Sequence, residues 1–246
     1  MLRVKPSTER IKVHVYGQAI LDGFKLILQG SGEIWPVIGL SLAVSGAATL
    51  IASAIGLPIG YFLGISRFAV RGTLILLVNT AMGFPPVVIG LFVYMALSRT
   101  GPLGQLGLLF TPQAMVIAQV ILAAPIVAGV ATAAIASVPR DLRLQVRALG
   151  ASRLQESLAV FKEGRRGVMA AVIAGFGSVI SEVGAVSIVG GNIQGSTRVM
   201  TTAIVFYVGR GEFGLAMAWG MVLLGIALLA TAALTLVQQR GSMYDR

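Results

Sequence analysis

One carboxylate, that of Glu182, interrupts an otherwise uncharged and apolar stretch at residues 167–197. A carboxylate in a membrane is costly, so it should face the inside of a helix bundle, pair with a donor or cation, or lie near the interface. Arg198 follows after a short connection and is a candidate partner. Two roles stay open for Glu182: a gate or pathway residue, and a structural tether of its helix. Because an ionised carboxylate repels anions, we do not expect it to bind an anionic substrate directly.

The glycine-rich segment at residues 209–214 matches the dinucleotide-binding pattern G-x-G-x-x-G letter for letter. That pattern functions in a βαβ unit, with an acidic residue about 20 positions further along the chain. Here a long apolar stretch follows instead, and the next acid after Glu212 is Asp245. We therefore predict an external loop rather than a nucleotide site.

Several other chemistries are excluded by what the chain lacks. The sequence has no P-loop motif G-x-x-x-x-G-K-[ST], no cysteine, and one histidine, His14. Binding of ATP through a P-loop, thiol chemistry and a histidine-rich metal site are therefore not expected of this chain. Its apolar stretches also lack paired carboxylates, which argues against a membrane enzyme. No cofactor is implied.

The composition is that of a membrane protein. Of 246 residues, 56% are hydrophobic and 11% are charged, and the mean hydropathy is +0.88. A soluble domain would need more polar residues to cover its core. Charge-poor segments exceed the roughly 20 residues of a bilayer span and lack the alternation of β-barrel strands. We predict an all-α membrane protein with about five transmembrane helices, at residues 35–64, 73–97, 112–136, 167–189 and 214–237.

The basic residues predict the orientation. The net charge is +10, and residues 140–166 hold seven of the 19 Lys and Arg, which places this connection in the cytoplasm. Five spans then put the N-terminus outside, although that segment is also basic. A sixth span at residues 13–30 would reverse this, but the polar and apolar faces there predict an amphipathic helix at the membrane surface. We expect an N-terminal segment at 1–34, without a secretory signal, and one transmembrane domain at 35–246.

The long basic connection at residues 139–166 is the most informative part of the chain. Leucines recur among its charges, so it should form an amphipathic helix–turn–helix that breaks at Gly150. Such a unit offers a docking surface to a partner protein, and a loop on the membrane surface is the alternative. The basic excess thus belongs to topology, lipid and protein contacts, and no nucleic-acid partner is expected.

Small residues and prolines mark the predicted spans. Gly56, Gly60 and Gly64 repeat at four-residue intervals, a spacing that lets another helix approach closely, within the same chain or from a second subunit. Prolines inside spans bend helices and are places where a pathway could widen. These prolines are Pro58, Pro85, Pro86 and Pro125.

Two segments together resemble a known family. Residues 147–153 read RALGASR, and residues 180–185 read ISEVGA. These resemble the cytoplasmic signature loop and the following helix of binding-protein-dependent ABC importer permeases, with the closest match to permeases for tungstate and molybdate. Residues 79–90, NTAMGFPPVVIG, and 189–193, VGGNI, favour the tungstate type. The resemblance extends from about Trp35 to the end of the last span.

The resemblance implies a permease fold like those of molybdate and methionine importers, in the cytoplasmic (inner) membrane. A homodimer would enclose the pathway for an oxyanion such as tungstate or molybdate. Separate cytoplasmic ABC ATPase subunits would supply ATP hydrolysis, and an extracytoplasmic binding protein would deliver the substrate. The implied ATPase-coupling residues are Arg147, Ala148, Leu149, Gly150, Ala151, Ser152 and Arg153. The pathway or gate candidates are Asn79, Pro85, Pro86, Ser181 and Glu182.

The chain departs from the family pattern on both flanks of Gly150. The general loop begins Glu-Ala-Ala, where this chain has Leu144, Gln145 and Val146. The later Ile-x-Leu-Pro positions hold Val160, Lys162 and Glu163. The alternatives to the tungstate-type permease are a stand-alone secondary transporter or channel, and an ABC permease for another small solute. Ion-coupled carriers often have several intramembrane acids and internal repeats, whereas this chain has one such acid and no evident repeat.

Overall fold

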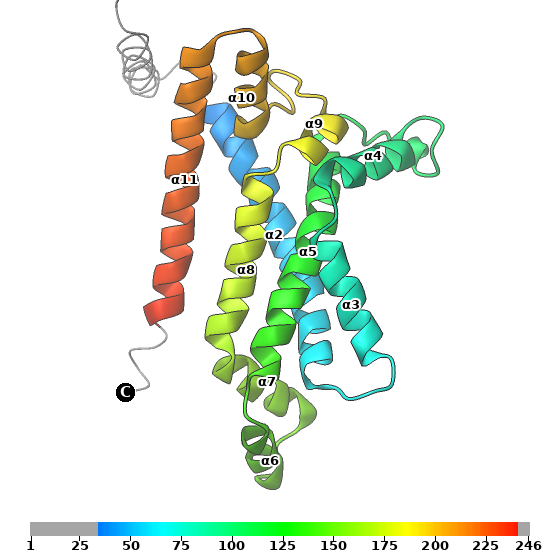
Figure 1. Cartoon of the computed structure of the whole chain (residues 1–246), viewed down its shortest axis with the longest axis vertical. Coiled ribbons are helices and arrows are strands. Elements are labelled where there is room, and N and C mark those ends of the chain that lie inside the picture. The colour runs from blue at the N-terminus through cyan, green and yellow to red at the C-terminus, as the bar shows by residue number, and fades with distance from the viewer. Residues whose placement is uncertain (1–33, 241–246) are drawn as a thin grey trace, which may run out of the picture.

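The computed structural model describes residues 34–240, and this part of the chain is helical with no strand. The amphipathic helix expected at residues 13–30 lies outside the described residues. Figure 1 shows the helices as a bundle whose long members run roughly along one axis. The elements are α2 (Ile34–Ile65), α3 (Arg71–Met82), α4 (Pro86–Leu97), η1 (Gly104–Leu106), α5 (Pro112–Ala136), α6 (Arg140–Ala148), α7 (Arg153–Glu163), α8 (Arg165–Ile180), α9 (Gly184–Gly190), α10 (Met200–Gly209) and α11 (Phe213–Arg240).

Helices α2 and α5 form the closely packed centre of the bundle. A Cβ atom added at Gly56 would lie 2.9 Å from the Ala124 carbonyl oxygen, and one at Gly60 would lie 2.6 Å from the Ala131 Cβ. Gly64 approaches Ile135 in the same way. The three glycines therefore pack α2 against α5 within one chain. Of the two predicted possibilities, contact within the chain and contact with a second subunit, the structure shows the first.

Two of the five predicted spans are broken by sharp bends. The range 73–97 comprises α3 and α4, which meet at 94°, and the range 167–189 comprises α8 and α9, which meet at 57°. Each of α3 and α4 is about 18 Å long at 1.5 Å per residue, short of the roughly 30 Å of the hydrocarbon core. The structure thus has three long apolar helices, or up to five spans if each bent pair counts as one.

Some prolines lie inside continuous helices, and others lie at a helix break. Pro58 lies inside the continuous helix α2, and Pro125 lies inside the continuous helix α5. At the α3–α4 break, Pro85 has an extended backbone and Pro86 is the first residue of α4. Because the residue before a proline disfavours the helical conformation, the Pro85-Pro86 pair ends one helix and begins another.

Helices α8, α10 and α11 complete the bundle. Helix α8 packs against both α2 and α5, and α10 and α11 form an antiparallel pair at the edge (Figure 1). The predicted external connection at 198–210 is therefore mostly the helix α10, which was not expected. The segment at 209–214 forms the tight turn between these helices, with Gly211 at φ +75° and an Arg210–Glu212 ion pair of 2.7 Å.

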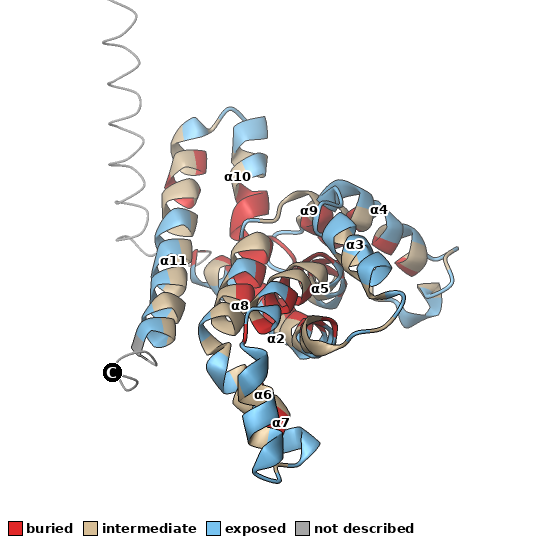
Figure 2. Ribbon diagram, turned by 60° about the horizontal axis from the view of Figure 1, so that its bottom comes forward, coloured by how far each residue is buried: buried red, intermediate tan, exposed pale blue. Residues whose placement is uncertain are grey.

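The two ends of the bundle differ in charge. The connection from α2 to α3, with Arg67 and Arg71, and the α6–α7 hairpin lie at one end, here called the basic end (Figure 1). The α3–α4 and α8–α9 breaks and the α10–α11 turn lie toward the opposite end. Figure 2 shows buried residues in α2, α5, α8 and α10, whereas α3, α6 and α7 are mainly exposed.

Candidate functional site

The turn between α6 and α7 is built on Gly150. Its φ of +80° lies in the left-handed region that favours glycine. The Gly150 N–H donates to the Arg147 carbonyl at 2.9 Å, and the Ala151 N–H donates to the Val146 carbonyl at 3.2 Å. This pair of bonds is a Schellman motif, which satisfies the last carbonyls of α6. The predicted helix–turn–helix with its break at Gly150 is confirmed.

Helix α7 begins with a capping box. The Ser152 hydroxyl accepts a hydrogen bond from the Gln155 N–H at 3.3 Å, and the Gln155 side-chain oxygen accepts one from the Ser152 N–H at 2.7 Å. These bonds satisfy donors that the first turn of a helix otherwise leaves free. Two consecutive capping devices, with Ala151 between Gly150 and Ser152, thus fix the angle between α6 and α7.

Glu156 holds the two helices of the hairpin together. Its carboxylate accepts a 2.9 Å hydrogen bond from Arg143 Nε and a 2.7 Å bond from Arg147 Nε, and the residue is only 4% exposed. The Arg147 hydrogen bond lowers the pKa of Glu156 from its usual value against the opposing effect of burial, and the Arg143 hydrogen bond adds to the lowering. The pKa of Arg147 is raised by the same contact. Glu156 is therefore an ionised internal partner of two arginines.

The hairpin is also attached to the end of α2. The Ser157 hydroxyl hydrogen-bonds the Tyr61 hydroxyl at 2.8 Å, and the Tyr61 and Phe161 rings stack with centroids 5.1 Å apart. Arg143 donates a longer, 3.4 Å bond to the Ile65 carbonyl at the end of α2. Buried Val160 packs with Ile135 near the end of α5 and with Val138 just before the hairpin. The hairpin is thus fixed to α2 as well as to the helices that precede and follow it.

The two helix breaks lie side by side near the opposite end. A Cβ at Gly90 of α4 would lie 2.6 Å from the Ala185 Cα of α9, so only glycine allows this approach. One at Gly184 would lie 2.6 Å from a methyl group of Val87. The structure therefore brings the pathway candidates Pro85, Pro86, Ser181 and Glu182 into one region.

Glu182 lies in the break between α8 and α9 rather than inside an uninterrupted helix. One carboxylate oxygen accepts a 2.9 Å hydrogen bond from the Ala185 N–H in the first turn of α9. The expected pair with Arg198 does not form. Arg198 donates to the Asn192 side-chain oxygen at 3.2 Å and lies over the Phe206 ring, 4.1 Å from its centroid. The prediction was wrong because α10, which was not expected, supplies an aromatic partner for the guanidinium.

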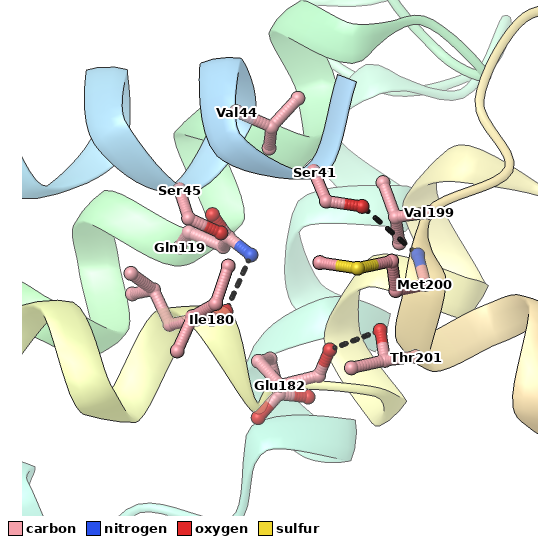
Figure 3. A pocket seen from close by; sticks show the side chains of 10 residues that line it. Ser41, Val44, Ser45, Gln119, Ile180, Glu182, Val199, Met200 and Thr201 are labelled. Carbon is pink, nitrogen blue, oxygen red and sulfur yellow. Dashed lines mark hydrogen bonds between the residues drawn. The ribbon is translucent and has the colours of Figure 1, made fainter. Parts of the chain in front are cut away.

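Buried polar groups from neighbouring helices satisfy the backbone of this break (Figure 3). Gln119 of α5 donates from Nε2 to the Val179 carbonyl at 2.9 Å, and the Thr201 hydroxyl donates to the Glu182 carbonyl at 2.9 Å. Ser41 of α2 accepts a 2.9 Å bond from the Met200 N–H. A cavity of about 10 Å³ lies between these groups, and Gln119 Oε1 has no partner within the described residues. Backbone freed by a break in a membrane helix needs such partners.

The remaining predicted residues fall into two separate places. Asn79 is exposed on α3, less than one helical turn before the α3–α4 break. Ser181 is exposed, and its hydroxyl donates to the Gly177 carbonyl at 2.8 Å. The coupling candidates at 147–153 all lie on the hairpin at the basic end. The length of α8 alone, 16 residues or about 24 Å, separates the hairpin from the breaks.

Comparison with protein families identifies the chain. Residues 56–242 match the family described as the binding-protein-dependent transport system inner membrane component. The chain belongs to this family. Membership in this family of ABC importer permeases makes the chain a multi-pass protein of the inner membrane and removes the stand-alone carrier from the alternatives left by the sequence.

Two curated relatives of this permease cover most of its length. A probable anion ABC transporter permease protein of Haloferax volcanii is 43% identical over 197 residues, which are 78% of this chain and 85% of the relative. The tungstate uptake system permease protein TupB of Peptoclostridium acidaminophilum is 38% identical over 224 residues, 89% of this chain and 98% of the relative.

Solved structures show that the fold is that of ABC importer permeases. An inward-facing structure of the MetNI methionine ABC transporter matches with a TM-score of 0.68 and 18% identity, covering 88% of this chain and all of that chain. A bacterial alginate ABC transporter in complex with its periplasmic protein matches with a TM-score of 0.70 and 19% identity, covering 88% and 82% of the two chains. The expected methionine-importer-like fold is confirmed.

Two residues that organise the permease were not among the predicted site residues. Glu156 is one of the charges of the basic connection, and Ser152 and Gln155 just before it form the S-x-x-Q signal of a helix start. That signal predicts Glu156 in the first turn of a helix, but not its contact with α6. Gln119 gave a weaker signal, as a lone polar side chain in an apolar span.

Proposed function

We propose that this permease forms the translocation pathway for a tetrahedral oxyanion of the tungstate or molybdate type. The observation that carries the proposal is the similarity along almost the whole chain to a permease named for tungstate uptake, which this chain covers to 98%. The anion permease of Haloferax volcanii supports the same substrate class. Nothing in the chemistry of the described residues separates tungstate from molybdate, so the selection lies with an external binding protein.

The basic end is the cytoplasmic end, and the α6–α7 hairpin couples the permease to an ABC ATPase subunit. Seven Lys and Arg in this connection support the orientation. The residues at 147–153 present the turn of the hairpin, while Tyr61, Ser157 and Phe161 fix it to α2. Movement of the hairpin by ATP-driven closure of the ATPases would therefore move α2 with it.

A homodimer encloses the pathway, with α3 facing it. Helix α3 has no buried residue in the single chain, and its Asn79 side chain is exposed. A carboxamide facing lipid would leave its donors and acceptors unpaired, at a cost of several kcal/mol by water-to-hydrocarbon transfer. An aqueous pathway between two copies supplies partners for Asn79, Ser181 and the region of the helix breaks. Neutral donors suit an oxyanion better than the carboxylate of Glu182, whose bond to Ala185 supports a tethering role.

Uptake into proteoliposomes tests the function. The permease is reconstituted with the ATPase subunit and the binding protein of its transport system, and metal uptake is measured by mass spectrometry. We expect tungstate or molybdate uptake that requires ATP and both partners, with sulfate a poor competitor. Calorimetry of the binding protein with the three anions checks the substrate class separately. Preference for sulfate or an amino acid would contradict the oxyanion assignment, and ATP-independent uptake would contradict the coupling.

A further inference from the structure

The turn of the α6–α7 hairpin exposes no acidic side chain. Between Asp141 and Glu163 the sequence has one acid, Glu156, which is 4% exposed. Both of its carboxylate oxygens accept hydrogen bonds from arginines of α6, and its burial keeps an outside cation from reaching them. Asp141 and Glu163 lie at the two ends of the hairpin where it joins the bundle. The hairpin tip, defined here as residues 144–158, therefore presents only positive charge.

Two guanidinium groups carry this charge. Arg147 uses its Nε–H on Glu156, but 58% of its side chain is exposed, which leaves its terminal N–H groups free to reach outward. Arg153 is exposed at the start of α7, and no acidic residue within 34–240 forms an ion pair with it. Guanidinium groups favour carboxylates, which they bind through two parallel hydrogen bonds.

Leucines surround these arginines. Leu149 is 87% exposed at the turn, and Leu154 is 70% exposed next to Arg153. Leu158 follows Leu154 by four residues, so both lie on one face of α7. A group of exposed leucines on a rigid surface outside the bundle is typical of a protein contact.

The position of the tip favours a partner in the aqueous phase over the membrane surface. Figure 1 shows α6 beyond the ends of α5 and α8, past the apolar length of the bundle. The bonds of Ser157 and Arg143 to the end of α2 hold the hairpin in this position.

We propose that the hairpin tip docks in a groove of the ATPase subunit that has an apolar floor and an acidic rim. This inference rests on the proposed function, which makes the ATPase the cytoplasmic partner. Leu149 and Leu154 fill the floor, while Arg147 and Arg153 pair with carboxylates of the rim. A basic rim would place like charges against Arg153, which no acid of the tip pairs with, and against Arg147, which shares the single charge of Glu156 with Arg143.

Charge reversal at Arg153 tests the rim. The ATPase subunit that supports uptake is titrated onto the permease in phosphatidylcholine nanodiscs at several salt concentrations. We expect Arg153→Glu to weaken binding at least about tenfold and to flatten the salt dependence of the wild type. The matched control is Arg67→Glu, the same charge change at an exposed position in the α2–α3 connection on the same end of the molecule. It should change binding by less than about twofold.

A conservative variant identifies the rim directly. Arg153→Lys keeps the positive charge and supplies an amine, which a zero-length carbodiimide links to any carboxylate in contact with it. Mass spectrometry of the linked complex should find that amine joined to an Asp or Glu of the ATPase subunit. Links only within the permease, or none in a complex that has formed, would overturn the acidic rim.

Other outcomes are equally decisive. Equal weakening by Arg153→Glu and Arg67→Glu, or by neither, would overturn the proposal, because the effect would not belong to the tip. An effect of Arg153→Glu that appears only in anionic nanodiscs would assign the tip to the membrane surface and overturn it too. Uptake by the wild type is measured in parallel. No uptake by the wild type would contradict the proposed function. Normal uptake by Arg153→Glu would contradict only the acidic rim.

Discussion

At the scale of single residues, Glu156 and Gly150 decide the shape of the cytoplasmic hairpin by different means. Glu156 acts through charge, since its buried carboxylate joins two arginines of α6 to α7. Gly150 acts through its backbone, since φ is +80° and no atom lies within 4 Å of an added Cβ. A side chain at Gly150 would therefore disturb the turn through backbone strain and not through a clash with neighbouring atoms.

Replacing Glu156 by glutamine should loosen the hairpin without unfolding the bundle. The amide keeps the shape but loses the charge, leaves two cations unpaired, and should destabilise the hairpin by about 1–3 kcal/mol. A fluorophore on Leu149→Cys, in a chain with no other cysteine, reports the change as lower anisotropy. The probe should keep its wild-type anisotropy in Glu163→Gln, the matched change in an exposed glutamate. An unchanged signal in Glu156→Gln would contradict the bracing role.

The lowered pKa of Glu156 gives the same probe a pH dependence. A depressed pKa in the folded hairpin stabilises it above the usual glutamate pKa, and this stabilisation is lost as pH falls through the folded value. Anisotropy should therefore hold steady from neutral pH to below the usual pKa of glutamate and fall only in stronger acid. Glu156→Gln should lack this transition.

Substitutions at Gly150 should follow backbone preference rather than size. Asn tolerates the left-handed conformation, whereas β-branched Val does not and should cost about 1–2 kcal/mol. We expect Gly150→Val to reduce ATP-dependent uptake strongly while Gly150→Asn retains most of it, at equal membrane expression. Gly150→Asp should resemble Asn in backbone strain but adds an acid to the basic tip. Equal activity of the Val and Asn variants would contradict this account.

At the scale of elements, the sequence predicted the helices better than their interruptions. Long uncharged stretches marked α2, α5 and α11 almost to the residue, because hydrophobic length is what a membrane helix needs. The breaks in α3–α4 and α8–α9 could not be read from hydrophobicity, since both halves are apolar. Pro85-Pro86 signalled the first, but Pro58 and Pro125 carry the same residue type inside continuous helices.

The α8–α9 break depends on partners that are distant in sequence. Gln119 is 60 positions from Val179, and no local pattern indicates that its amide reaches the freed carbonyl. The same holds for Thr201 and the carbonyl of Glu182. The candidate residues could therefore be named from the sequence, but their grouping at two meeting breaks required the tertiary structure.

Removing the Gln119 amide should destabilise the break. Gln119→Leu keeps the approximate volume but removes one of the donors to the Val179 carbonyl, which also accepts the Glu182 N–H at 3.2 Å, so the cost should be about 0.5–1.5 kcal/mol. We expect a lower Tm in detergent and faster hydrogen exchange at residues 179–185. Gln113→Leu, on the same helix and outside this network, serves as the control. A Tm equal to that of the wild type would show that the Glu182 N–H alone satisfies the Val179 carbonyl and would contradict the role of Gln119.

At the scale of the whole molecule, charge and breaks occupy opposite ends. The basic end carries the hairpin and the arginines near α3, whereas the helix breaks and the polar cavity lie in the other half (Figure 1). The predicted orientation requires the connections at 67–71 and 140–166 to share one end, and they do, because the long helices cross between the two ends. ATP-dependent events and the substrate pathway would thus meet only through the helices.

Labelling single cysteines checks this orientation. Leu149→Cys on the hairpin and Ile193→Cys in the exposed α9–α10 connection are treated with a membrane-impermeant maleimide in oriented vesicles. We expect right-side-out vesicles to label the variant at Ile193 and inside-out vesicles to label the one at Leu149. Labelling of both from one side would contradict the assigned topology.

The three glycines of α2 also have a mechanical consequence. Because Gly56, Gly60 and Gly64 leave no space between α2 and α5, the two helices behave as a single stiff beam. Its lower end holds the hairpin through Tyr61, and its upper end reaches α10 through the Ser41–Met200 bond. Movement of the hairpin should therefore be transmitted along α2 and α5 to the opposite end of the bundle. Bending should occur in α3, α4 and the α8–α9 break at Glu182.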